Sequence, residues 1–88
     1  MLQSVITTEF KKDFKRQKKR GKPLEKIQAV MKSLVEGKAL EPRYRDHVLV
    51  GNYNGRRECH IEPDWLLIYK KTKTSIIFER TGTHSDLF

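Results

Sequence analysis

The hydrophobic residues in the first part of the chain recur at helical spacing. Phe10 and Phe14 lie four residues apart, so they share one face of a helix. A short strand is predicted before this helix, over Leu2–Ile6, and Thr7 or Thr8 can cap its first turn. The remaining positions of the helix are nearly all polar, which predicts a narrow apolar stripe and a broad basic face.

A second helix is predicted over Pro23–Glu36. Gly21 separates it from the first helix, and Pro23 suits its first turn. Gly37 is placed to end it. Its apolar residues step along the chain by three and four, as in Leu24, Ile27, Met31 and Leu34. Such a stripe is typical of a surface that packs against a core.

From Tyr44 the spacing of apolar residues changes to two, which is typical of strands. Four segments show it: HVLVGNY, GRRECHI, WLLIYK and SIIFERT. Asn54-Gly55 is a strong signal for a tight hairpin between the first two, and connections this short require antiparallel neighbours. The pattern predicts an α+β fold, in a single domain over residues 1–88. Two N-terminal helices would pack on one face of a four- to five-stranded, mainly antiparallel sheet, leaving the other face open to a ligand.

The charge of the chain changes this picture at one place. The net charge is +8, and the first 22 residues hold eight Lys or Arg against two acidic residues. Such a basic element suits nucleic acid or an acidic protein surface, although a solvated helix face would look the same. The first helix carries seven of these cations: Lys11, Lys12, Lys15, Arg16, Lys18, Lys19 and Arg20.

Other classes of function find little support. The chain has one cysteine, Cys59, which excludes an intrachain disulfide and a cysteine-based metal site. His47 and His60 do not have the spacing of metal ligands, and no glycine-rich phosphate loop is present. We therefore expect no metal and no cofactor. With no signal peptide and no long apolar run, we expect a cytoplasmic protein that does not enter a membrane.

All three histidines, His47, His60 and His84, lie in the strand half or the tail. Alternation along the strand directs His60 away from the face of Cys59 and Ile61. Histidine serves as acid or base near neutrality. Cleavage of RNA without a metal needs a base for the 2′-OH, a cation for the phosphorane and an acid for the leaving 5′ oxygen.

The residues alone leave other interpretations open. His47 could be a turn residue bonded through Asp46, and His60 a surface histidine. Asp64 could cap a turn and Trp65 could belong to the core. Composition and spacing therefore predict only a basic α+β domain that binds RNA.

Three stretches carry a resemblance to a known family: RDHVLVG, CHIEPDWLLIYK and FERTGTH followed by LF. They resemble the YafQ branch of the RelE-type toxins of bacterial toxin–antitoxin pairs, most strongly over residues 44–88. The resemblance implies a ribonuclease-like fold and a metal-independent endoribonuclease that cuts mRNA in the ribosomal A site. It also implies the ribosome and mRNA as partners, with a DinJ-like antitoxin in a 2:2 complex.

The functional residues of that family fall on seven positions of this sequence: His47, His60, Asp64, Trp65, Arg80, His84 and Phe88. The resemblance implies His84 as the general acid, His60 with Asp64 on the base side, and His47 in support. Arg80 is expected to bind the phosphate, and Phe88 and Trp65 to contact the substrate. A turn over Thr81–Thr83 would bring Arg80, His84 and Phe88 to the rim of one pocket.

Two alternatives of other classes remain at this point. One is a ParE-like toxin, an inhibitor of gyrase with the same fold and no nuclease activity. The other is a non-catalytic RNA-binding domain. Neither needs His60, Asp64 and His84 together, so the set of histidines favours the nuclease.

Overall fold

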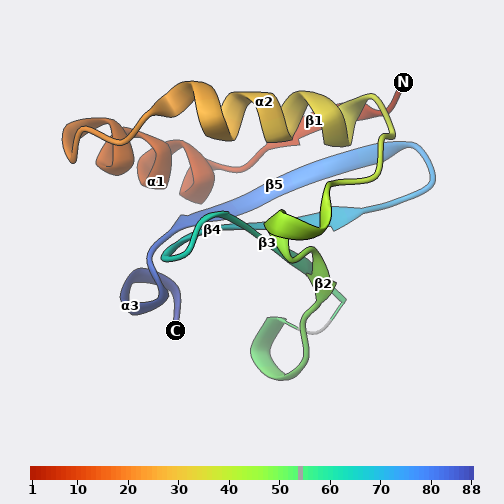
Figure 1. The fold of residues 1–88 in the computed structure, drawn as a ribbon. Coiled ribbons are helices and arrows are strands. Elements are labelled where there is room, and N and C mark those ends of the chain that lie inside the picture. Colours follow the sequence, from red (N-terminus) through yellow and green to blue (C-terminus); the bar gives the residue numbers. More distant parts are fainter. Residues whose placement is uncertain (54) are drawn as a thin grey trace.

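The computed structural model describes residues 1–53 and 55–88. It is a five-stranded sheet with strand order β1-β5-β4-β3-β2, covered on one face by two helices (Figure 1). The elements are β1 Gln3–Ile6, α1 Thr8–Lys19, α2 Leu24–Val35, the 3₁₀ turn η1 Pro42–Tyr44, β2 His47–Val48, the 3₁₀ turn η2 Gly51–Tyr53, β3 Arg57–Glu62, β4 Trp65–Lys71, β5 Ser75–Gly82 and α3 His84–Leu87. The predicted α+β class, with two N-terminal helices on the sheet, is confirmed.

The first helix begins where its capping residue predicts, but its buried face is more polar than expected. The Thr7 side chain accepts a hydrogen bond from the Phe10 amide at 3.0 Å, which satisfies a free donor of the first turn. The buried residues of α1 are Phe10, Asp13 and Gln17, and Phe14 is only half-buried. An acidic side chain therefore occupies the middle of the stripe that faces the sheet.

The sheet is mixed because β1 pairs with β5 in parallel, while β2, β3, β4 and β5 form antiparallel neighbours. Side chains alternate between the two faces, so β4 buries Trp65, Leu67 and Tyr69 against the helices. Leu66 and Ile68 point to the other face. The main core, which includes Ile27, Phe10 and Phe78 with these β4 residues, lies between the helices and the sheet.

The face of the sheet opposite the helices is not fully open, which corrects the sequence expectation. Leu66 and Ile68 form a second cluster there with Leu87 of α3. Leu49 and Tyr53, from the connection between β2 and β3, pack against it. The C-terminal helix and this connection therefore frame the part of the face that stays exposed.

Two predicted segments differ from the structure. HVLVGNY is strand only at His47–Val48, and the chain then forms η2, whose Gly51 has a φ of +74°. The expected hairpin at Asn54-Gly55 includes Asn54, which lies outside the described residues. Thr81 is not in a turn, because β5 continues to Gly82. Across residues 1–53 and 55–88, no helix has the length and apolar character needed to cross a membrane.

Candidate active site

The register of the sheet places the candidate residues in two neighbouring rows on the face opposite the helices. Cross-strand partners share a face. One row is His47, Glu58, Ile68 and Arg80, and the next is His60, Leu66 and Gly82. Only Thr83 separates β5 from α3, so the first residue of α3, His84, lies beside His60 at the end of the second row. Residues far apart in the sequence are brought together by pairing alone.

Glu58 joins two of the histidines. Its Oε1 lies 3.1 Å from His60 Nε2 and 3.5 Å from His47 Nε2, and its side chain is buried. The second nitrogen of each ring faces a carbonyl oxygen, at 2.6 Å from Arg45 for His47 and 3.4 Å from Pro63 for His60. Each imidazole therefore has acceptors on both sides, and its protonated form can donate to both.

His84 is held differently, by Asp64. Asp64 Oδ1 lies 2.6 Å from His84 Nδ1 and accepts a hydrogen bond from the His84 backbone N–H at 2.9 Å. These bonds, the backbone one foremost, lower the pKa of Asp64 below its ordinary value. Among the described residues, Nε2 of His84 has no hydrogen-bond partner. The sequence expectation grouped Asp64 with His60. In the structure the hydrogen bonds of Asp64 go to His84 instead, and its role in the reaction stays a prediction.

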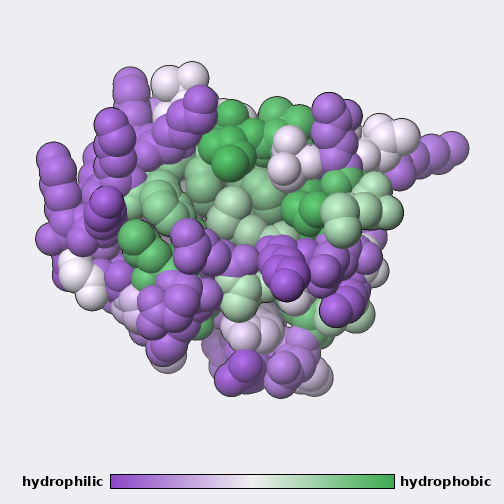
Figure 2. All heavy atoms as spheres, turned by 90° about the horizontal axis from the view of Figure 1, so that it is seen from above, coloured by the Kyte–Doolittle hydropathy of each residue, from purple (hydrophilic) through white to green (hydrophobic). Residues whose placement is uncertain are grey.

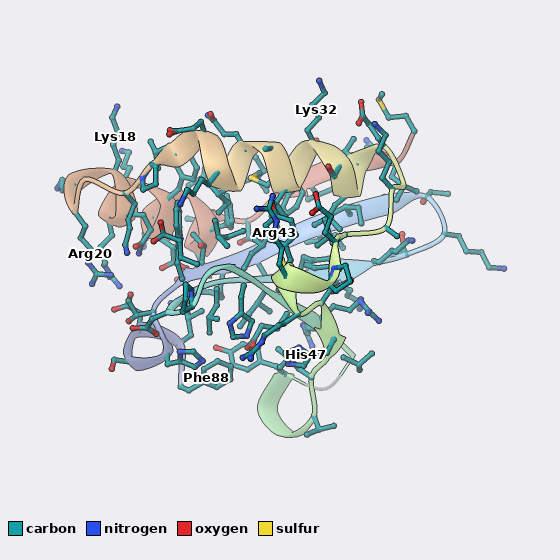
Figure 3. All side chains as sticks on the ribbon, viewed as in Figure 1. Lys18, Arg20, Lys32, Arg43, His47 and Phe88 are labelled. Carbon is teal, nitrogen blue, oxygen red and sulfur yellow. The ribbon has the colours of Figure 1, made fainter. Side chains whose placement is uncertain are left out.

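Aromatic contacts complete the row. The His84 ring lies 5.8 Å from the His60 ring and 6.4 Å from that of Phe88, centre to centre. Tyr53 contacts Phe88 edge-on at 5.3 Å, and its hydroxyl donates to the Leu87 carbonyl at 3.1 Å. Phe88 stays 64% exposed, at the end of the chain below the sheet (Figure 3). Its ring is therefore placed beside the histidines and open to a ligand.

Arg80 is a fixed cation and not a free side chain at the rim. Its Nε donates to Asp13 Oδ2 at 2.6 Å and its Nη2 to Asp13 Oδ1 at 3.3 Å. Asp13 also accepts from the Thr81 backbone N–H at 3.1 Å. The hydrogen bonds from Arg80 to Asp13 raise the pKa of Arg80 above its ordinary value, so the guanidinium stays charged.

Trp65 does not lie on the surface, which corrects the expectation that it contacts the substrate. Its side chain is fully buried in the core on the helix side of the sheet. Its Nε1–H donates to Thr81 Oγ1 at 3.0 Å, and the Thr81 hydroxyl donates to the Leu66 carbonyl at 2.7 Å. Trp65 therefore supports β4 and β5 from behind, and its ring is not available for stacking on a base.

Three residues of the site were not singled out from the sequence: Glu58, Asp13 and Tyr53. Alternation along β3 gives Glu58 the same face as His60, so a signal for it existed. Asp13 meets Arg80 only because α1 docks on β5, which no local pattern reveals. Tyr53 was assigned to a strand, whereas it lies in η2.

The basic side chains of α1 are all exposed, as the sequence predicts for its polar face. Seen from the helix side, hydrophilic residues surround a band of hydrophobic ones (Figure 2). Arg20, at the end of α1, points toward α3 (Figure 3), where its Nη1 and Nη2 donate to Asp86 at 2.6 and 3.1 Å. Within the part of the chain that the structure describes, no three His, Cys, Asp or Glu residues form a metal-binding group.

Solved structures of the same fold are closely similar. YafQ from Escherichia coli strain BL21(DE3) superposes with a TM-score of 0.96 at 39% identity, covering 100% of this chain and 99% of that one. The toxin in the E. coli DinJ-YafQ complex gives 0.94 at 40% identity, with coverage of 100% and 99%. A metal-bound toxin from Helicobacter pylori gives 0.93 at 38% identity, and both chains are covered in full.

The fold and these similarities define the class of this protein as a toxin of the RelE superfamily. The family model described as "Bacterial toxin of type II toxin-antitoxin system, YafQ" matches residues 2–88. The mRNA interferase toxin YafQ of E. coli K12 is 44% identical over 81 residues, which are 91% of this chain and 88% of that protein. The chain belongs to the YafQ family of type II toxins.

Proposed function

We propose that this chain is an mRNA interferase, an endoribonuclease that cuts mRNA in the ribosomal A site and so inhibits translation. The observation that carries the proposal is the line of three imidazole rings, His47, His60 and His84, with carboxylates beside them. The E. coli relative named an mRNA interferase supports the choice of substrate. The reaction proposed is attack of the ribose 2′-OH on the adjacent phosphate.

The base belongs to the pair of His60 and Glu58. His60 takes the proton of the 2′-OH at Nδ1, the nitrogen on its exposed side, as the 2′ oxygen forms its bond to phosphorus. The imidazolium that results is stabilised by the buried carboxylate of Glu58, 3.1 Å from Nε2. His47 shares the same carboxylate oxygen. Its part is to orient Glu58.

The acid is His84. Asp64 accepts from its Nδ1–H and fixes the ring, so that Nε2–H faces outward. This proton passes to the 5′ oxygen as the bond from phosphorus to that oxygen breaks. The products are a 2′,3′-cyclic phosphate, which water can open to a 3′ phosphate, and a 5′-OH. Each proton transfer contributes about 10²–10⁴-fold, and every step uses side chains alone, so no metal is required.

Arg80 and Phe88 bind the substrate on either side of this chemistry. Arg80 is the cation for the charge that develops on the phosphorane, and Asp13 holds its guanidinium in place. Phe88 offers an exposed ring on which a base can stack, a contact worth about 1–3 kcal/mol. Both residues adjoin the histidine row and need no rearrangement of the sheet.

The partners follow from the surface of α1 and from the relatives. Its exposed cations suit the phosphates of ribosomal RNA, in a contact that weakens as salt rises. The E. coli relative forms a complex with DinJ. We propose a DinJ-like antitoxin for this chain, in a 2:2 complex, which would meet the same basic surface with acidic residues and prevent access to the ribosome.

Expression without an antitoxin tests the proposal. The wild-type chain should arrest growth, and primer extension on cellular mRNA should show new 5′ ends within codons. His84→Ala should relieve the arrest and remove these ends, because the acid is lost. Ser85→Ala changes the next exposed residue of α3 and should stay as toxic as wild type. Arrest by His84→Ala at equal expression would refute the catalytic role.

A further inference from the structure

A cavity of about 430 Å³ lies beside His60 and is distinct from the contacts described above. It is enclosed by α2, by η1 with the residue that follows it, and by the turn between β3 and β4. Its lining includes Lys26, Arg43, Tyr44, Arg45 and Glu62, together with one side of His60. The volume falls in the range of small-molecule sites, about 300–1,000 Å³. His60 therefore has a hollow next to it, into which a substrate chain can continue.

The charge of this cavity favours an anion. Glu62 is neutralised by Lys22 and Lys26, whose Nζ atoms lie 3.2 and 3.1 Å from its carboxylate. The hydrogen bonds from these lysines lower the pKa of Glu62. Arg43 has a partner of its own, because its Nε lies 3.5 Å from Glu41 Oε2. Arg45 therefore remains as the cation that the lining offers to an anion. Arg45 is exposed and has no ion pair among the described residues.

The backbone at Arg45 links the cavity to the histidines. Arg45 has a φ of +50°. Among the described residues, it is the single non-glycine residue with a positive φ. Such a conformation costs of order 1–3 kcal/mol and marks functional sites. Here it directs the Arg45 carbonyl at His47 Nδ1, 2.6 Å away. One strained residue thus anchors a histidine by its backbone and supplies a cation to the cavity by its side chain.

Arg43 adds a flat surface. Its guanidinium lies 4.7 Å from the centre of the Tyr44 ring, and its Nη2 donates to the Tyr44 hydroxyl at 2.9 Å. In Figure 3 it lies on η1, between α2 and His47 in that view. A guanidinium held against an aromatic ring presents a planar cation. RNA-binding proteins use such planes to stack unpaired bases.

We propose that this cavity is a nucleotide subsite that binds the RNA residue next to the scissile phosphate. Arg45 binds the phosphate of that nucleotide, and the Arg43–Tyr44 pair stacks on its base. The subsite adjoins His60, whereas Phe88 lies beside His84. It therefore extends the site and does not replace Phe88 as a platform. The identity of the ligand as RNA rests on the function proposed above.

Binding is tested apart from cleavage with a trinucleotide RNA that carries 2′-O-methyl groups and cannot be cut. Titrated into the ¹⁵N-labelled chain, it should shift the backbone amides of Tyr44, Arg45 and Ile61. Arg45→Gln and Arg43→Gln should each weaken binding by at least about fivefold. Lys73→Gln removes the same charge from an exposed site in the β4–β5 turn and should change the affinity by less than about twofold. Circular dichroism verifies that each variant is folded.

Three results would overturn the subsite. One is equal affinity of Arg45→Gln and Lys73→Gln. Another is a set of shifted amides confined to α1. The third is tighter binding of an oligoglutamate peptide at the same amides, which would make the cavity a protein-docking site. If the wild-type chain binds the trinucleotide as expected but never cuts mRNA on ribosomes, the proposed function fails while the subsite stands.

Discussion

Glu58 shows how a single buried residue can organise the site. One carboxylate oxygen serves both His47 and His60, so its removal affects two imidazoles at once. A buried carboxylate between two histidines also fixes their orientation before a substrate arrives. This is the kind of preorganised charge that contributes most to catalysis by electrostatics.

Glu58→Gln should therefore lower the rate of mRNA cleavage by about 10²-fold, because a neutral amide cannot stabilise the imidazolium of His60. The rate is measured with ribosomes programmed with a defined mRNA, under single-turnover conditions. Glu79→Gln is the matched control, since Glu79 pairs with Arg56 at 2.9 Å and contacts none of the histidines in the described part of the chain. Equal rates for both variants would show that Glu58 has no part in the reaction.

At the scale of residues, the sequence predicts those parts of the site that depend on strand alternation. His60 and Glu58 share a face for this reason. Trp65 fails as a substrate contact because the same alternation assigns it to the helix side, where Thr81 accepts its N–H. The attachment of Arg80 to Asp13 depends on the docking of α1, and no local pattern contains that information.

The C-terminal helix is the element that the sequence analysis missed. It has four residues, too few to be stable alone. Thr83 and Asp86 form a capping box, and T-H-S-D has the spacing of that motif. A side chain on Gly82 would meet Asp86 Oδ2 at 2.8 Å. The signal was present, but helix α3 is stabilised from outside, by Leu87 in the second cluster and by Arg20.

Asp86→Asn tests this stabilisation through its pH dependence. Arg20, and then the Thr83 backbone, hydrogen-bond to Asp86 and hold its pKa well below the ordinary value. A depressed carboxyl pKa adds stability above the unfolded value, about 3.9, and this stability is lost as the pH falls through the folded value. The variant should be less stable than wild type at pH 7 by about 0.5–1 kcal/mol, and the difference should shrink toward pH 2.

Urea unfolding at pH 7, 5 and 3, followed by circular dichroism, measures this difference. Lys19→Gln removes a charge from the same turn of α1. It has no ion pair in the described residues, so it should show no such trend. A constant difference between Asp86→Asn and wild type at all three pH values would mean that the carboxylate charge does not hold α3.

At the scale of the whole molecule, the sequence predicts the layers but not how they meet. Helical and strand periodicities are local, so two helices and a sheet could be expected from them. The parallel pairing of β1 with β5 joins residues more than 70 positions apart, and neither periodicity contains it. The same holds for the pair of Arg20 and Asp86, which joins the basic helix to the element that carries His84.

The ion pair of Arg20 and Asp86 connects the basic surface of α1 to the surface that carries the histidine row. The exposed cations lie on α1, while His60 and His84 of the histidine row lie beside one another at α3. Figure 1 shows that α1 and α3 lie on opposite sides of the sheet. If the ribosome binds the cations of α1, α3 is the element that connects this contact to the histidine row. The central claim is that the 2′-OH of the mRNA is the nucleophile and that the histidine row moves its proton.

The most direct measurement replaces one nucleotide of the mRNA. Ribosomes are programmed with an mRNA that has a 2′-deoxyribose on the 5′ side of the mapped cut, and the purified wild-type chain is added. We expect no cleavage at that bond, because no 2′-OH is present to attack the phosphate, while the all-ribose mRNA is cut and yields a 2′,3′-cyclic or 3′ phosphate. Cleavage of the 2′-deoxy mRNA at the same bond and at the same rate would contradict the account.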